Sequence, residues 1–243
     1  MNVRFLPQVG CFGKLPGVGD FVQRRLPAAF LDAWDPGFQQ ALAASRRWLG
    51  ERWPAAYHGS AAWRFVLPAQ VCGDRAWAGV TGAATDRVGR CFPMVIAAPF
   101  ADGDAEVARI LENDAWFGAL EVIHRQAQAA PLIDARAFDA ALARLPGPLA
   151  RFPERLPTSE VVAASDRAGS VDGDRLHGLP SLAANVSERR CLWWTQGNAD
   201  RPADRFATHG LPDPDTYLRM LGTARDPVAD PGDDAPFVLS DPA

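Results

Sequence analysis

The stretch Phe92-Pro93-Met94-Val95-Ile96-Ala97-Ala98-Pro99 decides the fold of this chain, because it is apolar throughout and only eight residues long. A run of this length and composition is typical of a β-strand that is buried on both faces. Such a strand lies in a sheet that other elements cover on each side, so we expect helices on both faces. The sequence therefore predicts a layered single domain of the α/β (or α+β) class.

Four more segments are candidates for the same sheet. Residues 63–67 and 77–81 partly alternate apolar and polar side chains, and Gly73-Asp74 between them supplies a turn signal, so we expect a hairpin. Residues 191–195 have the aromatic composition of a strand, and residues 160–163 are a further candidate. Because hairpin strands pair antiparallel, we predict a mainly antiparallel central sheet flanked by helices.

A helical pattern precedes the hairpin. Core-facing side chains recur every three or four positions, as expected for one face of a helix: Phe30, Trp34, Phe38, Leu42, Ser45 and Leu49. Asp35-Pro36 interrupts this pattern, because Asp favours the N-cap and Pro the first helical position, and Gly50 ends it. We therefore expect a kinked pair of helices rather than one straight helix.

Further helices are expected after the central strands. Residues 104–130 predict two helices, because the apolar face changes near Asn113-Asp114, where a new N-cap fits. A short helix is predicted over about 134–145. A last helix is predicted to begin after Asp213.

Composition limits the class of protein. The 243 residues, 48% of them hydrophobic, suit one domain, which we expect over residues 1–225, with an acidic, mobile tail over 226–243. The net charge of −4 argues against a nucleic-acid surface, which needs a basic stripe. No apolar run approaches the roughly 20 residues of a membrane span, and no signal-peptide pattern begins the chain. We expect a cytoplasmic protein without membrane insertion.

Cysteine and histidine give no metal or catalytic signature. The four cysteines lack C-x-x-C spacing, and the four histidines lack a His-Glu-x-x-His pair. The chain also lacks the Gly-x-Ser-x-Gly elbow of a hydrolase. We predict buried thiols, no cofactor, no metal site and no catalytic residue, and we expect His124 to be a partly exposed helix residue.

Two segments combine glycines, fixed charges and aromatic side chains, residues 10–21 and 85–93. The first has neither the glycine spacing of a P-loop nor that of the dinucleotide fingerprint. It forms either a tight surface turn, which uses the conformational freedom of glycine, or an interaction loop. In the second interpretation Asp20, Arg24 and Arg25 supply the charges.

The second segment carries Asp86, Arg87 and Arg90 around Gly89. One interpretation is a catalytic acid beside an anion clamp. A second is partner binding, in which Arg87 and Arg90 present forked donors to a carboxylate or phosphate. Another is a loop braced by its own ion pair, with Gly89 turning the chain into the buried strand. A surface ion pair contributes only about 0–1 kcal/mol, so stability alone is a weak reason for the pattern. Internal bracing and partner binding both stay open.

These segments belong to an ordered set of motifs. In chain order the motifs are Gly13-Lys14-Leu15-Pro16, Gly19-Asp20-Phe21, Arg25-Leu26-Pro27, Phe30-Leu31-Asp32, Trp34-Asp35, Ser45-Arg46, Trp63-Arg64-Phe65, Asp86-Arg87-Val88-Gly89-Arg90 and Phe92-Pro93. Through them, residues 10–95 resemble the TagF (ImpM) family of proteins associated with bacterial type VI secretion. Cys91 departs from the aromatic residue expected there.

The resemblance implies an accessory regulator rather than an enzyme: a cytoplasmic protein that represses type VI secretion after translation by binding other proteins. The expected partners are type VI secretion components, including the forkhead-associated scaffold protein Fha, and not nucleic acid. Our candidate partner-binding residues, which would supply complementary charge and buried area, are Asp20, Arg24, Trp63, Arg64, Asp86, Arg87 and Arg90. The alternative is a small hydrolase or phosphate-ester-binding enzyme that uses Asp86 and the nearby arginines.

Overall fold

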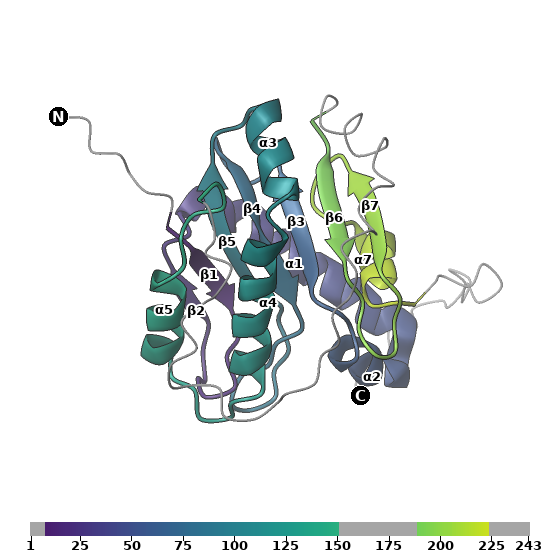
Figure 1. Ribbon diagram of the computed structural model, residues 1–243. Coiled ribbons are helices and arrows are strands. Elements are labelled where there is room, and N and C mark those ends of the chain that lie inside the picture. The colour runs from purple at the N-terminus through teal and green to yellow at the C-terminus, as the bar shows by residue number, and fades with distance from the viewer. Residues whose placement is uncertain (1–7, 151–188, 224–243) are drawn as a thin grey trace, which may run out of the picture.

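The computed structural model describes residues 8–150 and 189–223, which form a seven-stranded sheet between two layers of helices (Figure 1). Neighbouring strands are all antiparallel, in the order β2-β1-β5-β4-β3-β6-β7. The strands are β1 (Gly10–Gly13), β2 (Val22–Arg24), β3 (Trp63–Leu67), β4 (Ala76–Gly82), β5 (Met94–Phe100), β6 (Cys191–Thr195) and β7 (Asp204–Thr208). The predicted fold class, a layered α/β domain with an antiparallel sheet, is confirmed.

The centre of the sheet consists of β3, β4 and β5. The β3–β4 pairing runs from Trp63 opposite Thr81 to Leu67 opposite Trp77, and β5 pairs with the other edge of β4. Every residue of β3 and β4 is buried, and so is every residue of β5 except Pro99. The predicted hairpin and the predicted doubly buried strand are both confirmed.

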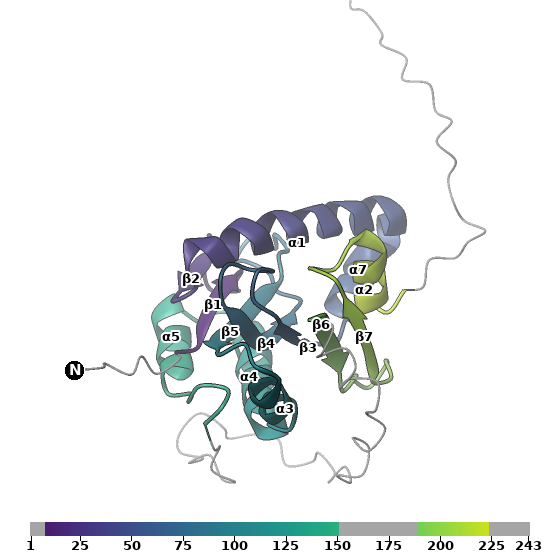
Figure 2. The same ribbon diagram turned by 90° about the horizontal axis from the view of Figure 1, so that it is seen from above.

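One face of the sheet is covered by α1 (Ala28–Leu49), α2 (Trp53–His58) and α7 (Pro214–Met220). Figure 2 shows α1 crossing this face from the edge at β2 toward the edge at β7. A helix that spans so many strands buries its apolar stripe along its whole length. It therefore joins the N-terminal and C-terminal strands into one core.

An aromatic stack forms the centre of this core. The ring of Trp34 lies 5.3 Å from that of Phe30 and 4.4 Å from that of Phe38, measured between centroids. On the sheet side, Trp34 also faces Phe65 of β3 and Trp193 of β6. Since aromatic side chains bury the largest apolar areas of any residue, this stack fixes α1 on the centre of the sheet.

The predicted kinked pair of helices is wrong, because residues 28–49 form the single helix α1 with Pro36 in its interior. Pro36 has no N–H to donate to the carbonyl of Asp32 one turn earlier. The helix nevertheless continues, because the stripes before and after Pro36 pack on the same sheet face. Tertiary packing outweighs the local cost of the proline.

The other face is covered by α3 (Asp104–Leu111), α4 (Asp114–Gln128) and α5 (Ala135–Ala143). The side chain of Asn113 accepts a hydrogen bond from the N–H of Trp116, which caps the start of α4. The predicted separation of residues 104–130 into two helices is therefore confirmed. The short helix predicted near 134–145 is also present.

The C-terminal part adds β6, β7 and α7 to the sheet and to the α1 face. The strand at 191–195 and the helix after Asp213, whose carboxylate accepts from the N–H of Thr216, are as predicted. The short strands β2 and β7 and the helix α2 were not expected from the sequence. The candidate strand at 160–163 and the tail at 226–243 lie outside the described residues.

Among the described residues, no helix combines the length and the apolar character that crossing a bilayer would need.

Replacing Pro36 by alanine restores the missing helical hydrogen bond, so we expect it to raise the free energy of unfolding by about 1–2 kcal/mol. This is the cost of an interior proline less the entropy that proline removes from the unfolded chain. Urea denaturation followed by tryptophan fluorescence measures the change. The matched control is Pro214→Ala at the first position of α7, where no helical bond is gained and no increase is expected. A Pro36→Ala variant no more stable than the natural chain would contradict this account.

Candidate functional site

Three loops meet at one end of the sheet. Because β1 and β4 are both antiparallel to β5, and β1 is antiparallel to β2, the loops over 14–21 and 83–93 lie at the same end. Gln128, at the last position of α4, accepts from the N–H of Thr85 and donates to the carbonyl of Lys14, which brings the 129–134 loop there too. These loops lie together at the lower end of the molecule in Figure 1. The two segments singled out from the sequence are thus neighbours.

The carboxylate of Asp86 holds two of these loops together. Its side chain is fully buried and accepts hydrogen bonds from the N–H groups of Val88 (3.0 Å) and Arg90 (2.9 Å) and from Nε of Arg90 (2.6 Å). The ammonium group of Lys14, also buried, lies 3.4 Å from Asp86 Oδ2. Gly89 adopts a φ of 81° inside this loop, a conformation that suits glycine.

Backbone contacts and the Arg90 guanidinium complete the junction. The N–H of Arg87 donates to the carbonyl of Val18 at 3.0 Å, and Arg90 Nη2 donates to the carbonyl of Gly19. The internal bracing that the sequence left open is therefore present, and it extends across both loops rather than within one.

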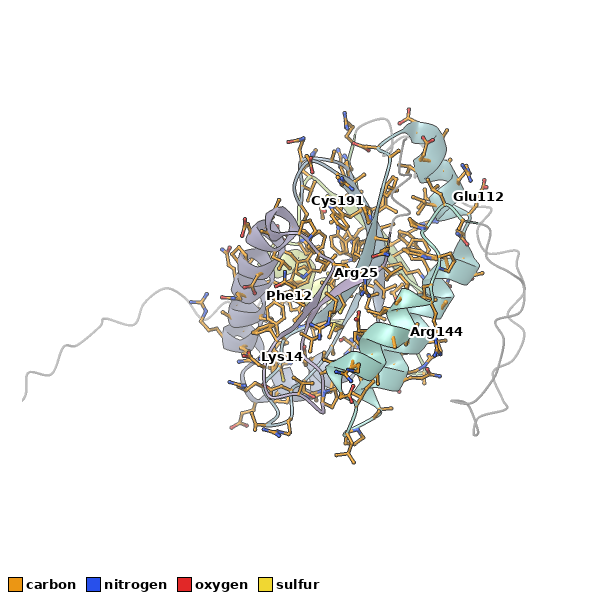
Figure 3. All side chains as sticks on the ribbon, turned by 90° about the vertical axis from the view of Figure 1, so that its left-hand side faces the viewer. Phe12, Lys14, Arg25, Glu112, Arg144 and Cys191 are labelled. Carbon is orange, nitrogen blue, oxygen red and sulfur yellow. The ribbon has the colours of Figure 1, made fainter. Side chains whose placement is uncertain are left out.

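Aromatic rings pack beneath the junction. Phe21 stacks on Phe12 with 5.1 Å between centroids, and Phe92 meets both rings edge-on. The ammonium of Lys14 lies 3.8 Å above the centre of the Phe21 ring. Figure 3 views the two layers from the β2 edge, with α1 on one side and α4 and α5 on the other, and shows Lys14 toward the lower end. The charges and the rings thus form one packed unit.

The environment of Asp86 fixes its charge. Burial by itself raises the pKa of the carboxyl, but hydrogen bonds from the backbone and guanidinium of Arg90 and from the Val88 N–H outweigh it, with the charge of Arg90 adding to them. The pKa of Asp86 is lowered to about 2. Asp86 is therefore a permanently ionised anchor near neutral pH.

The outer surface of the three loops is apolar and cationic. Of the four large hydrophobic side chains that are exposed in the described part of the chain, three lie on these loops: Leu132 at 94%, Val88 at 68% and Phe21 at 39%. The backbone of Ile133 packs directly against Gly17, and this contact brings the neighbouring Leu132 to the 14–21 loop. Exposed apolar side chains that gather at one place, beside charges, are typical of protein-binding surfaces. We name Phe21, Arg87, Val88 and Leu132 the loop surface.

The charged candidates differ in how free they are. Arg87 is exposed, and no side-chain partner is found for it in residues 8–150 and 189–223. Asp20 is exposed and accepts from the N–H of Phe21. Arg24 lies 3.8 Å from Asp139 of α5, and Arg90 is held by Asp86 and Gly19. Arg87 is therefore the charge that is most available to a partner.

Trp63 and Arg64 do not belong to the loop surface, which corrects the set chosen from the sequence. They are only 4% and 3% exposed. The indole N–H of Trp63 donates to the carbonyl of Met220, and Arg64 donates to the carboxylates of Glu121 and Asp114. These bonds attach α7 and α4 to β3, so both side chains serve the fold. The buried Asp86 likewise acts inside the junction.

The sequence missed the apolar half of the loop surface. Leu132 follows Pro131 in a helix-to-helix connection, and Val88 lies between Arg87 and Gly89. A hydrophobic residue inside a polar turn is a weak signal, because single exposed apolar residues are common. Only their shared location gives them significance.

His124 and three of the four cysteines are buried. The expectation of a partly exposed His124 is wrong, since it is buried on α4 against the sheet, and burial lowers its pKa to about 4. Cys11, Cys72 and Cys191 are buried as expected, and Cys91 is half-buried. Within the described ranges, no group of three or more His, Cys, Asp or Glu side chains could hold a metal ion. The absence of cofactor, metal and catalysis stays a prediction.

Replacing Asp86 by asparagine should destabilise the protein by about 3 kcal/mol near pH 7, because Lys14 then loses its buried counter-charge. Since the pKa of Asp86 is lowered in the fold, its contribution is complete above about pH 4 and is lost as pH falls toward about 2. Urea titrations at several pH values across this range measure the free energy of unfolding. The part of its decrease with falling pH that comes from Asp86 should be missing in the variant. The control is Asp20→Asn, an exposed carboxylate nearby, with an expected change within about 0.5 kcal/mol. Equal acid sensitivity in Asp86→Asn and the natural chain would refute the assignment.

Comparison with known proteins agrees with the motifs. The family described as "TagF N-terminal domain, Type VI secretion system-associated" matches residues 10–145, from β1 to the end of α5. The solved structure titled "Crystal structure of PA0076 from Pseudomonas aeruginosa PAO1" is similar with a TM-score of 0.68 and 29% identity, over 97% of this chain and 100% of that one. The comparison with curated proteins gives no match. Because the matched segment exceeds half of the 243 residues and contains all three loops, the chain belongs to the TagF N-terminal domain family of type VI secretion-associated proteins.

Proposed function

We propose that this protein is a cytoplasmic regulator that restrains type VI secretion after translation, and that it acts by docking its loop surface on a component of the secretion apparatus. The forkhead-associated scaffold protein Fha is the first candidate partner. The single observation that supports a docking role most directly is that Val88 and Leu132, the two most exposed large hydrophobic side chains in the described residues, lie on loops that meet at the same end of the sheet. Arg87, for which those residues offer no side-chain partner, lies on one of these loops.

The bracing of two of the three loops supports this proposal. Asp86, Lys14 and Arg90 hold the 14–21 and 83–93 loops in one arrangement before any partner arrives. A preformed surface loses less conformational entropy on binding than a mobile one. Arg87 then offers forked donors to a carboxylate of the partner, and Val88 and Leu132 offer apolar area.

The environment of Asp86 argues against the alternative, a hydrolase or phosphate-ester-binding enzyme that uses this carboxylate. Asp86 is inaccessible, it already accepts from Val88 and Arg90, and its pKa is lowered to about 2. A general base needs a pKa nearer to the working pH and access to the substrate proton. We therefore retain a non-enzymatic role.

A binding experiment tests the loop surface. The double variant Arg87→Glu/Val88→Asp should weaken capture of a type VI secretion component by at least roughly tenfold. The first change reverses the charge of a contact, and the second replaces an apolar contact by a carboxylate. The tagged chain is expressed in its own bacterium, and the proteins that it captures are identified by mass spectrometry. The purified chain is then titrated with purified Fha. The control Arg47→Glu/Val122→Asp carries the same changes on exposed positions of α1 and α4. Equal capture by both double variants would exclude the loop surface.

A deletion strain tests the regulatory role separately. We expect that loss of the gene increases export of type VI effectors at unchanged levels of the secretion proteins, because the restraint acts after translation. Complementation with the natural chain should restore the restraint, and complementation with Arg87→Glu/Val88→Asp should not. Unchanged export in the deletion strain would remove the regulatory proposal, whatever the binding result.

A further inference from the structure

A cavity of about 580 Å³ lies mainly in the C-terminal part of the fold, and none of its lining residues belongs to the loop surface. Its apolar walls are Ala61, Trp63 and Met220, and its polar walls come from the β6–β7 connection and from α7. This volume falls in the range of small-molecule sites, and an apolar wall with a few polar groups is the usual composition of such sites.

Arg201 is the distinctive side chain of this cavity. Its Nε donates to the carbonyl of Gly59 at 3.0 Å, which fixes the direction of the guanidinium. In the described part of the chain, no carboxylate lies within ion-pair distance of Arg201, and its two terminal nitrogens have no acceptor. By contrast, Arg219 in the same cavity is neutralised by both carboxylate oxygens of Asp204. Arg201 is thus an oriented cation for which residues 8–150 and 189–223 supply no counter-ion.

The backbone is shaped to receive this guanidinium. Gly222, which lines the cavity, has a φ of 70°, and a Cβ at this position would lie only 1.4 Å from Arg201 Nη1. A side chain at 222 would therefore displace the guanidinium from its place. Gly222 and Gly59 together hold Arg201 from two sides.

The cavity also carries negative charge, which restricts what can bind. Asp200 lines it, is exposed, and its carboxylate makes no interaction with another described residue. Thr195, which is buried, adds a hydroxyl. A simple anion would meet Arg201 favourably but would be repelled by Asp200. A ligand that carries both a carboxylate and an ammonium satisfies both groups.

We propose that this cavity is a binding site for a small zwitterion of the amino-acid class. The two terminal nitrogens of Arg201 donate a forked pair of hydrogen bonds to the ligand carboxylate, which accepts them. Its ammonium group faces Asp200, and its side chain contacts Trp63 and Met220. The site is independent of the loop surface, since it shares none of its residues.

Ligand-observed NMR with the full-length chain tests the proposal. Each of the twenty standard amino acids is titrated separately, and at least one should bind saturably. The N-acetylated form of the best binder lacks the positive charge, and its amide lacks the negative charge, so each should bind roughly tenfold or more weakly. The proposal would be overturned if no amino acid bound, or if the N-acetylated form and the amide bound as tightly as the unmodified amino acid. Inorganic phosphate is the comparison anion, and binding of phosphate alone would also overturn it.

Two variants locate the binding. Arg201→Met keeps an unbranched stem but removes the guanidinium and its charge, and should weaken binding roughly ten- to hundredfold, the range for lost hydrogen bonds to a charged group. Gly222→Ala keeps every charge but displaces the guanidinium, and should weaken binding similarly. Its matched control is Gly50→Ala, another glycine at positive φ (52°), where a Cβ meets open space and binding should be unchanged. Thermal unfolding verifies that each variant is folded. Natural affinity in a folded Arg201→Met variant would refute the site.

Discussion

The hydrogen bonds and ion pairs of the buried Asp86 carboxylate hold together the end of the sheet at which the 14–21 and 83–93 loops meet. The carboxylate collects two backbone N–H groups, the guanidinium of Arg90 and the ammonium of Lys14 from two segments that lie about 70 residues apart in the chain. A buried charge that loses its partner costs several kcal/mol, so the fold is more stable when both segments are in place. The position of the outer loop residues follows from this internal requirement.

The charges of the site therefore have two separate roles. Those that face inward, Asp86 and Lys14, are matched and removed from water, and they make the loops rigid. The outward-facing charge of Arg87 stays in contact with water and needs no buried partner. Arg87 and the apolar Val88 both lie exposed in the braced loop. A braced inner layer with exposed groups outside it is the arrangement that the proposed docking role requires.

The family segment and the C-terminal part contribute to one core. Residues 10–145 supply β1 to β5 and α1 to α5, while β6, β7 and α7 complete the face under α1 through Trp193 and the Trp63–Met220 bond. The Arg201 cavity is formed mainly by this C-terminal part. A ligand bound there would contact α7, which packs on α1. Docking and ligand binding would thus use different parts of the same scaffold.

The sequence by itself predicted the central strands and the division between α3 and α4, and it singled out the two charged loops, because periodicity, caps and motifs are local signals. It did not reveal β2, β7 or the unbroken α1, since short strands and an interior proline depend on packing with distant residues. It also could not separate Arg64 from Arg87. Only the tertiary structure buries Arg64, by bringing it to Glu121 some 57 residues away, and leaves Arg87 exposed, because the burial of a charge depends on partners that the fold supplies.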